Sequence, residues 1–157
     1  MSPHNNPRGI RVKLALWILA LAALAALPAS ALEWRWSYQG EGVTALGSFT
    51  TTDAPNADGF YEITAIKGEA NGVAITALQP AGTSIPGNDG YPVDNFVRTD
   101  APQLTLHGFG YGLANGTYAT PFYGAHFVKP DYYAFFSDPA NRKTSEPAVK
   151  FSATIVR

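Results

Sequence analysis

Apolar and polar residues alternate with a period of two through most of the chain after residue 31. Single polar residues separate Trp34, Trp36 and Tyr38, and the same spacing recurs at residues 43–50 and, most regularly, at 149–156. Alternation of this kind predicts half-buried β-strands. No window of eleven or more residues in this region has helical spacing without a Gly or Pro inside it. The sequence therefore predicts an all-β fold.

Short turn signals divide the pattern into hairpins. Tight reversals are favoured at Gly40-Glu41-Gly42, Asp58-Gly59, Asn71-Gly72 and Asn115-Gly116. Strands are predicted at residues 34–39, 43–50, 60–67, 73–79, 93–98, 104–111, 117–123, 132–136 and 149–156, with loops at 80–92 and 137–147. About 8–9 short strands fit a single antiparallel β-sandwich or a small closed β-barrel, built as a hairpin meander whose last strand closes against an early one.

Two predicted strands depart from strict alternation in the same way. The segments ITAI at residues 63–66 and ITAL at residues 75–78 each place their apolar residues three apart. A period of two would put the members of each pair on opposite faces of the sheet. A β-bulge or a change of face is therefore expected in each strand.

Residues 1–31 have the composition of a secretory signal peptide. Arg8, Arg11 and Lys13 precede an uninterrupted apolar run at residues 14–27, and Ala29-Ser30-Ala31 supplies small residues for cleavage. This run would span only about 21 Å as a helix, short of the ~30 Å hydrocarbon layer. We therefore expect cleavage near Ala31 and release of residues 32–157, a single all-β domain, to the periplasm or the extracellular medium.

Cysteine content and charge narrow the range of functions. The chain has no Cys, which excludes disulfide scaffolds, zinc-thiolate sites and thiol nucleophiles. Three of its 11 Lys and Arg residues precede residue 32, which leaves 8 basic residues against 12 acidic ones. This balance argues against a nucleic-acid partner. No membrane span is expected after processing.

The first half of the predicted domain resembles a known group of proteins. The segments WSYQGEGVTALGSFTTT at residues 36–52 and GFYEITAIKGEANGVAITAL at residues 59–78, followed by Asp94-Asn95, are similar to small exported bacterial proteins of unknown function. Many of those carry a PEP-CTERM sorting tail, and residues 149–156 are not followed by one here. The resemblance covers about residues 34–95. It implies export and free secretion, and it supplies no catalytic residues.

Candidate chemistry is sparse. His107 and His126 are the two histidines after residue 31, and with a nearby Asp they are weak candidates for a metal site of two His and one carboxylate. No Gly-x-Ser-x-Gly elbow, complete calcium loop or nucleotide-binding glycine motif is present. We therefore expect no catalytic residues, no cofactor and no enzymatic activity. A His-dependent metalloenzyme is the third of three hypotheses for function.

Aromatic density supports the other two hypotheses. Seven aromatic residues fall within residues 122–136, and both faces of the strand predicted at 132–136 carry rings, so either both are buried or one is exposed for binding. The first hypothesis is a non-catalytic exported β domain that acts in the cell envelope or extracellular space through surface contacts. The second is a small-ligand or glycan binder that uses a barrel mouth or aromatic groove, lined by Trp34, Trp36, Tyr132 and Tyr133. A barrel cavity of ~300 Å³ or more would favour the second, and a filled interior the first. The partner class considered is a glycan or an envelope component.

Overall fold

The computed structural model describes residues 31–156. The predicted signal peptide, apart from Ala31, lies outside the described residues, as does Arg157. The strands within the described range are β1 (Leu32–Gly40), β2 (Val43–Thr51), β3 (Tyr61–Ala70), β4 (Val73–Leu78), β5 (Phe96–Val97), β6 (Tyr111–Leu113), β7 (Tyr118–Tyr123), β8 (Tyr132–Asp138), β9 (Lys143–Ser145) and β10 (Ala148–Ile155). The predicted all-β fold is confirmed for these residues.

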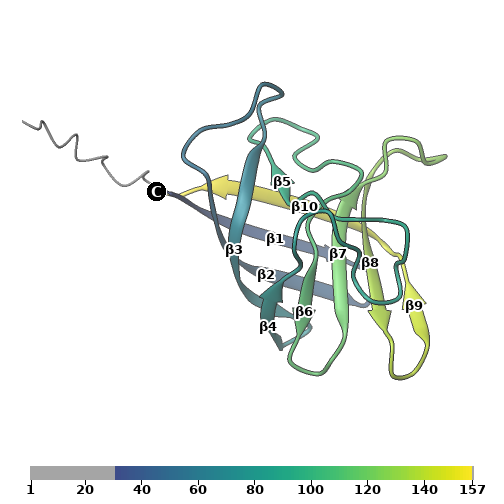
Figure 1. Cartoon of the computed structure of the whole chain (residues 1–157). Coiled ribbons are helices and arrows are strands. Elements are labelled where there is room, and N and C mark those ends of the chain that lie inside the picture. The colour runs from purple at the N-terminus through teal and green to yellow at the C-terminus, as the bar shows by residue number, and fades with distance from the viewer. Residues whose placement is uncertain (1–30, 157) are drawn as a thin grey trace, which may run out of the picture.

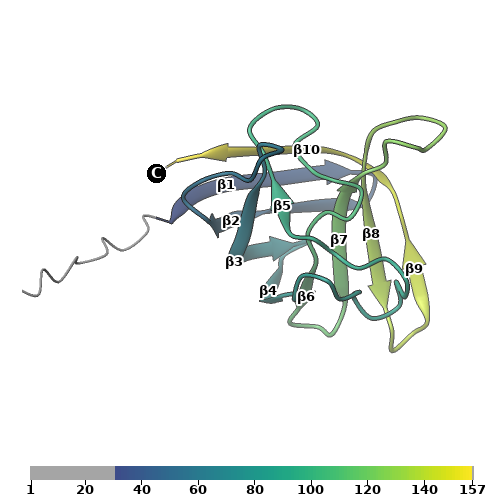
Figure 2. The ribbon, with the colours of Figure 1, turned by 45° about the horizontal axis from the view of Figure 1, so that its top comes forward.

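Eight of the strands form a closed antiparallel β-barrel. The order around the barrel is β10-β1-β2-β3-β4-β6-β7-β8, and a pairing of β10 with β8 closes it. Two short strands are additions, because β5 pairs with β3 and β9 with β8. In Figures 1 and 2, β1, β2 and β10 cross steeply to the upright strands β6, β7 and β8. The small closed barrel, one of the two predicted architectures, is therefore the correct one.

The last long strand closes the barrel against the first, as the sequence predicts. β10 pairs with β1 from Trp34↔Ile155 to Gly40↔Val149, so the two ends of the described chain lie side by side. On its other edge, β10 pairs with β8 over only two positions, Ala148↔Tyr133 and Val149↔Tyr132. The two strands then diverge, which leaves the farther part of β10 without a strand partner on that side.

The side chain of Gln103 takes the place of a strand in this gap. Its Oε1 accepts a hydrogen bond from the Ala153 N–H at 2.9 Å, and its Nε2 donates to the Ala153 carbonyl at 2.7 Å. The Gln103 N–H also donates to the Tyr132 hydroxyl at 2.7 Å. Because backbone polar groups need partners once they are buried, this side-chain amide completes the seam between β8 and β10.

Aromatic rings fill the barrel interior. Inward-facing residues of every barrel strand form one core together with Phe109. The rings of this core include Trp34, Trp36, Tyr38, Phe49 and Phe151. The Trp36 ring alone lies 5.4–6.4 Å, centroid to centroid, from four neighbouring rings. Rings at these distances are in packing contact. The interior is a filled core rather than a ligand cavity.

Both expected irregularities are β-bulges. In β3, Ala65 pairs with Thr50 and Ile63 with Thr51, so one extra residue lies between them and Ile63 and Ile66 both face the core. In β4, Ile75 and Ala77 pair with adjacent residues of β6, and Ile75 and Leu78 likewise both face the core. The apolar spacing of three therefore has the predicted cause.

Two predictions of local structure are wrong. Residues 104–111 are not a strand: Leu104 makes one isolated bridge to Val97, and β6 begins only at Tyr111. Gly108 turns the chain at a φ of 57°, and its carbonyl accepts from the N–H groups of Asp94 and Asn95. Residues 137–147 are not entirely loop, because β8 continues to Asp138 and β9 pairs with it.

Candidate functional site

The paired strands β7 and β8 direct one set of side chains into the barrel core and another set to the outside of the barrel. Tyr132 and Phe136 pack against the barrel core. On the outer face, Phe122 pairs with Tyr133 and Thr120 with Phe135. The sequence predicts rings on both faces of this segment, and the structure confirms that one set belongs to the core while the other lies outside the barrel.

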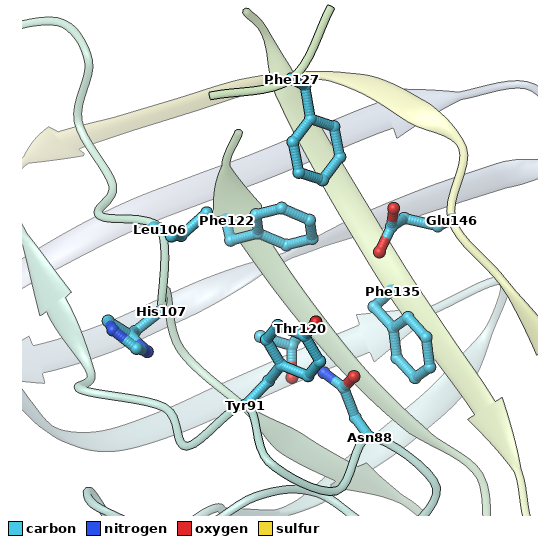
Figure 3. Close-up of a pocket in the computed structure, with 9 residues that line it drawn as sticks. All are labelled: Asn88, Tyr91, Leu106, His107, Thr120, Phe122, Phe127, Phe135 and Glu146. Atoms are coloured by element: carbon cyan, nitrogen blue, oxygen red, sulfur yellow. The ribbon is translucent and has the colours of Figure 1, made fainter. Parts of the chain in front are cut away.

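A pocket of about 240 Å³ opens on this outer face, where six segments of the chain meet. β7 and β8 form its floor. The β4–β5 loop, the segment between β5 and β6, the β7–β8 loop and the β9–β10 connection form its sides. The lining residues are Asn88, Tyr91, Leu106, His107, Thr120, Phe122, Phe127, Phe135 and Glu146 (Figure 3).

The β4–β5 loop reaches the pocket because glycine lets it lie directly on β8. Gly87 has a φ of 85°, and a Cβ there would lie 2.2 Å from Ser137 Oγ. The loop is closed at its base by two backbone hydrogen bonds, from Gly82 to Val93 at 2.8 Å and from Val93 to Thr83 at 3.0 Å. Asn88 and Tyr91 are therefore held at the pocket by a fixed loop.

The Asp94-Asn95 pair anchors the end of the same loop. Asp94 accepts from the Thr105 hydroxyl at 2.6 Å and from the Phe96 N–H at 3.1 Å. Asn95 is 2% exposed and donates to the Gln79 carbonyl at 2.8 Å. Burial raises the pKa of Asp94, and its hydrogen bonds partly offset that rise. This pair joins loop to barrel, so its role in the structure is architectural.

Three aromatic rings hold the β7–β8 loop above the pocket. Phe127 lies 4.7 Å from Tyr133 and 5.7 Å from Phe122, centroid to centroid. The Tyr133 hydroxyl donates to the Lys129 carbonyl at 2.7 Å, and the Gly124 N–H donates to the Asp131 carbonyl at 2.9 Å. The Phe127 ring is thus fixed as a wall of the pocket.

The polar groups of the pocket are few and unevenly satisfied. Thr120 is 3% exposed, and its hydroxyl has no hydrogen-bond partner among the described residues. Because the Pro92 carbonyl can only accept, His107 donates to it from Nδ1 at 2.8 Å. In this tautomer the Nε2 of His107 is the acceptor. Burial raises the pKa of Glu146, whose carboxylate points in among the rings in Figure 3.

The four residues predicted to bind a ligand are not brought together. Trp34 and Trp36 are 0% and 3% exposed inside the filled barrel, so they line neither a mouth nor a groove. Tyr132 packs at the edge of the same core. Tyr133 alone lies on the outer face, where it supports Phe122 and Phe127 next to the pocket. The side chains of Trp34 and Trp36 point from β1 into the barrel, which separates them from the aromatic residues on its outer face.

The two candidate metal ligands lie on different segments outside the barrel strands. His107 lies in the segment that precedes β6, and the exposed His126 lies in the β7–β8 loop. Within residues 31–156, no group of three or more His, Asp or Glu side chains is placed to hold a metal ion.

Sequence reasoning identified the aromatic density of residues 122–136 but not the pocket. Thr120 and Glu146 carry no motif that distinguishes them from other polar residues. Their significance comes from the packing of two separate connections over β7 and β8, and only the folded structure provides that information.

Comparisons with known proteins do not assign the chain to a family. The chain matches no family model, no curated protein and no solved structure. Residues 31–156 contain no helix with the length and apolar composition that a membrane crossing requires.

Proposed function

We propose that this protein is a non-catalytic, exported binding domain whose ligand site is the outer pocket on β7 and β8. The filled interior favours the hypothesis of surface contacts over a ligand held inside the barrel. The pocket gives those contacts a defined location. With the export that residues 1–31 predict, the site would meet its ligand in the periplasm or outside the cell.

The observation that carries this proposal is the recess walled by phenylalanine rings on the outer face of the barrel, which has the unpartnered Thr120 hydroxyl beneath it. Burying a hydroxyl without a hydrogen bond costs about 1–3 kcal/mol, so such groups are rare in folded proteins. Thr120 lines the pocket whose walls include Phe122, Phe127 and Phe135. A compact apolar ligand would cover these rings, with the buried Thr120 hydroxyl lying beneath the surface that such a ligand touches.

The size of the pocket limits what it accepts. Small-molecule sites usually measure ~300–1,000 Å³, and this pocket is about 240 Å³. It therefore suits a compact molecule or the terminal group of a larger one. An oligosaccharide would need a longer surface with more hydrogen-bonding groups, which makes an extended glycan the less favoured occupant.

Calorimetry with small probes tests the proposal. Benzyl alcohol and 3,3-dimethyl-1-butanol represent compact apolar ligands with one hydroxyl, and glucose represents a sugar. We expect the two alcohols to bind with dissociation constants on the order of 1 mM, equivalent to about −4 kcal/mol, and more tightly than glucose.

A matched pair of variants locates the binding. Phe135→Ala removes a pocket wall, whereas Leu46→Ala removes an exposed apolar side chain on β2, far from the pocket in sequence and 49% exposed. Phe135→Ala should weaken binding of the alcohols and Leu46→Ala should not. Equal loss in both variants, or no binding by the unmodified protein, would contradict the proposal.

A further inference from the structure

The pocket carries a negative charge that no lining residue neutralises. Glu146 is its one acidic lining residue, and no Lys or Arg of the described range lines it. The carboxylate comes from the connection between β9 and β10, and in Figure 3 it is directed toward the space among Phe122, Phe127 and Phe135. Glu146 is exposed to water at the pocket, so an anionic ligand would be repelled here and a cationic one attracted.

The walls are suited to a cation. The faces of aromatic rings carry partial negative charge, and a cation within about 6 Å of a ring centroid is attracted to it. Four rings line the pocket, those of Tyr91, Phe122, Phe127 and Phe135, and they come from four different segments. Rings on several sides together with one carboxylate form the kind of aromatic cage that accepts alkylated ammonium groups.

Building on the proposed function, we propose that the ligand of this pocket carries a compact alkylated ammonium group, such as a trimethylammonium, seated among the rings against Glu146. The methyl groups would cover the apolar ring faces, and the charge would be balanced by the carboxylate. A primary ammonium is less suited, because it holds its water strongly and three hydrogen-bond acceptors would have to replace that water. The pocket volume of about 240 Å³ accommodates a group of this size.

Two probes of the same shape separate charge from size. Choline is a cation, and 3,3-dimethyl-1-butanol is its neutral isostere, with carbon in place of nitrogen. Isothermal titration calorimetry of the full chain with each probe should show that choline binds about tenfold more tightly than the isostere. Tetramethylammonium should also bind, since the ammonium group is the recognised part.

Variants identify the residues responsible. Glu146→Gln should weaken binding of choline more than binding of the isostere and so reduce the preference for the cation. Glu41→Gln, which makes the same charge change in the exposed turn between β1 and β2, should leave the preference intact. Phe127→Leu keeps an apolar wall but removes a ring face, so it should reduce choline binding more than binding of the isostere. Near-ultraviolet circular dichroism of the buried tryptophans checks that each variant keeps its fold.

The possible results separate this inference from the proposed function. Equal binding of choline and its isostere would overturn the ammonium inference and leave a site for apolar ligands in place. A preference for choline that survives Glu146→Gln and Phe127→Leu would also overturn it, because the charge would then be recognised elsewhere. Binding of benzyl alcohol alone would likewise overturn it. Failure of all probes to bind would overturn both.

Discussion

Replacing Thr120 with Val should make the ligand-free protein more stable. Thr120 is 3% exposed and its hydroxyl has no partner among the described residues, so folding removes that hydroxyl from water without replacing its hydrogen bonds. Such a loss costs about 1–3 kcal/mol, and Val has nearly the same shape without the hydroxyl. We expect the free energy of unfolding to rise by about 1–2 kcal/mol, which corresponds to a Tm increase on the order of 5 °C.

Urea unfolding followed by tryptophan emission measures this change. Trp34 and Trp36 are the tryptophans of the described residues, and both lie in the core, so their emission reports global unfolding. Thr120→Ser keeps the hydroxyl and removes the methyl group, so it should be destabilising by about 1 kcal/mol. Thr154→Val, at an exposed position of β10, should change stability by no more than about 0.5 kcal/mol. If Thr120→Val is no more stable than the parent protein, then the hydroxyl is already satisfied and the reasoning fails.

Three further predictions concern the seam, the core and the charge of the pocket. Gln103→Ala should lower the urea midpoint by an amount equivalent to about 1–3 kcal/mol, because two backbone groups of β10 lose their partner; an unchanged midpoint would mean that water replaces the side chain. Burial raises the pKa of the hydrogen-bonded pair Tyr38 and Tyr111, so the unfolded chain loses these protons first and stability should fall above about pH 10, by roughly 1.4 kcal/mol per pH unit for each Tyr. Replacing both with Phe should flatten that dependence in alkaline urea titrations, and an unaltered slope would refute the assignment. Choline affinity should decline as the pH is lowered, beginning at a higher pH than for an ordinary Glu because burial raises the pKa of Glu146. His107 also lines the pocket, so calorimetry of Glu146→Gln and of His107→Asn assigns the effect, and a decline that persists unchanged in both variants would refute the role of Glu146.

Much of the barrel could be predicted from the sequence because its long strands follow local rules. In β1, β2 and β10, one residue in two faces the core, and that alternation is visible in the chain. Tight turns such as Asn71-Gly72 require positive φ, which the structure has at both residues, so the turn residues mark the hairpins. The bulges in β3 and β4 were predictable for the same reason, since they change the period locally.

The segments that build the pocket follow no local rule. Residues 104–110 have strand-like spacing, but their backbone groups bond to other segments: the Phe109 N–H donates to the Pro121 carbonyl, and the Gly108 carbonyl accepts from the Asn95 N–H. Tertiary contacts override local preference there. The face on which β1 presents Trp34 and Trp36 was also undetermined, because exposed and buried aromatic strips have the same period.

The proposed function requires that ligands bind on the outer face of β7 and β8 and not inside the barrel. Two-dimensional NMR during titration with choline and with 3,3-dimethyl-1-butanol tests it directly, because the indole N–H signals of Trp34 and Trp36 report the interior. We expect progressive shifts at Leu106, His107 and Phe127, with both core indole signals unmoved. Movement of either core indole signal, with the amides around the pocket unchanged, would contradict it.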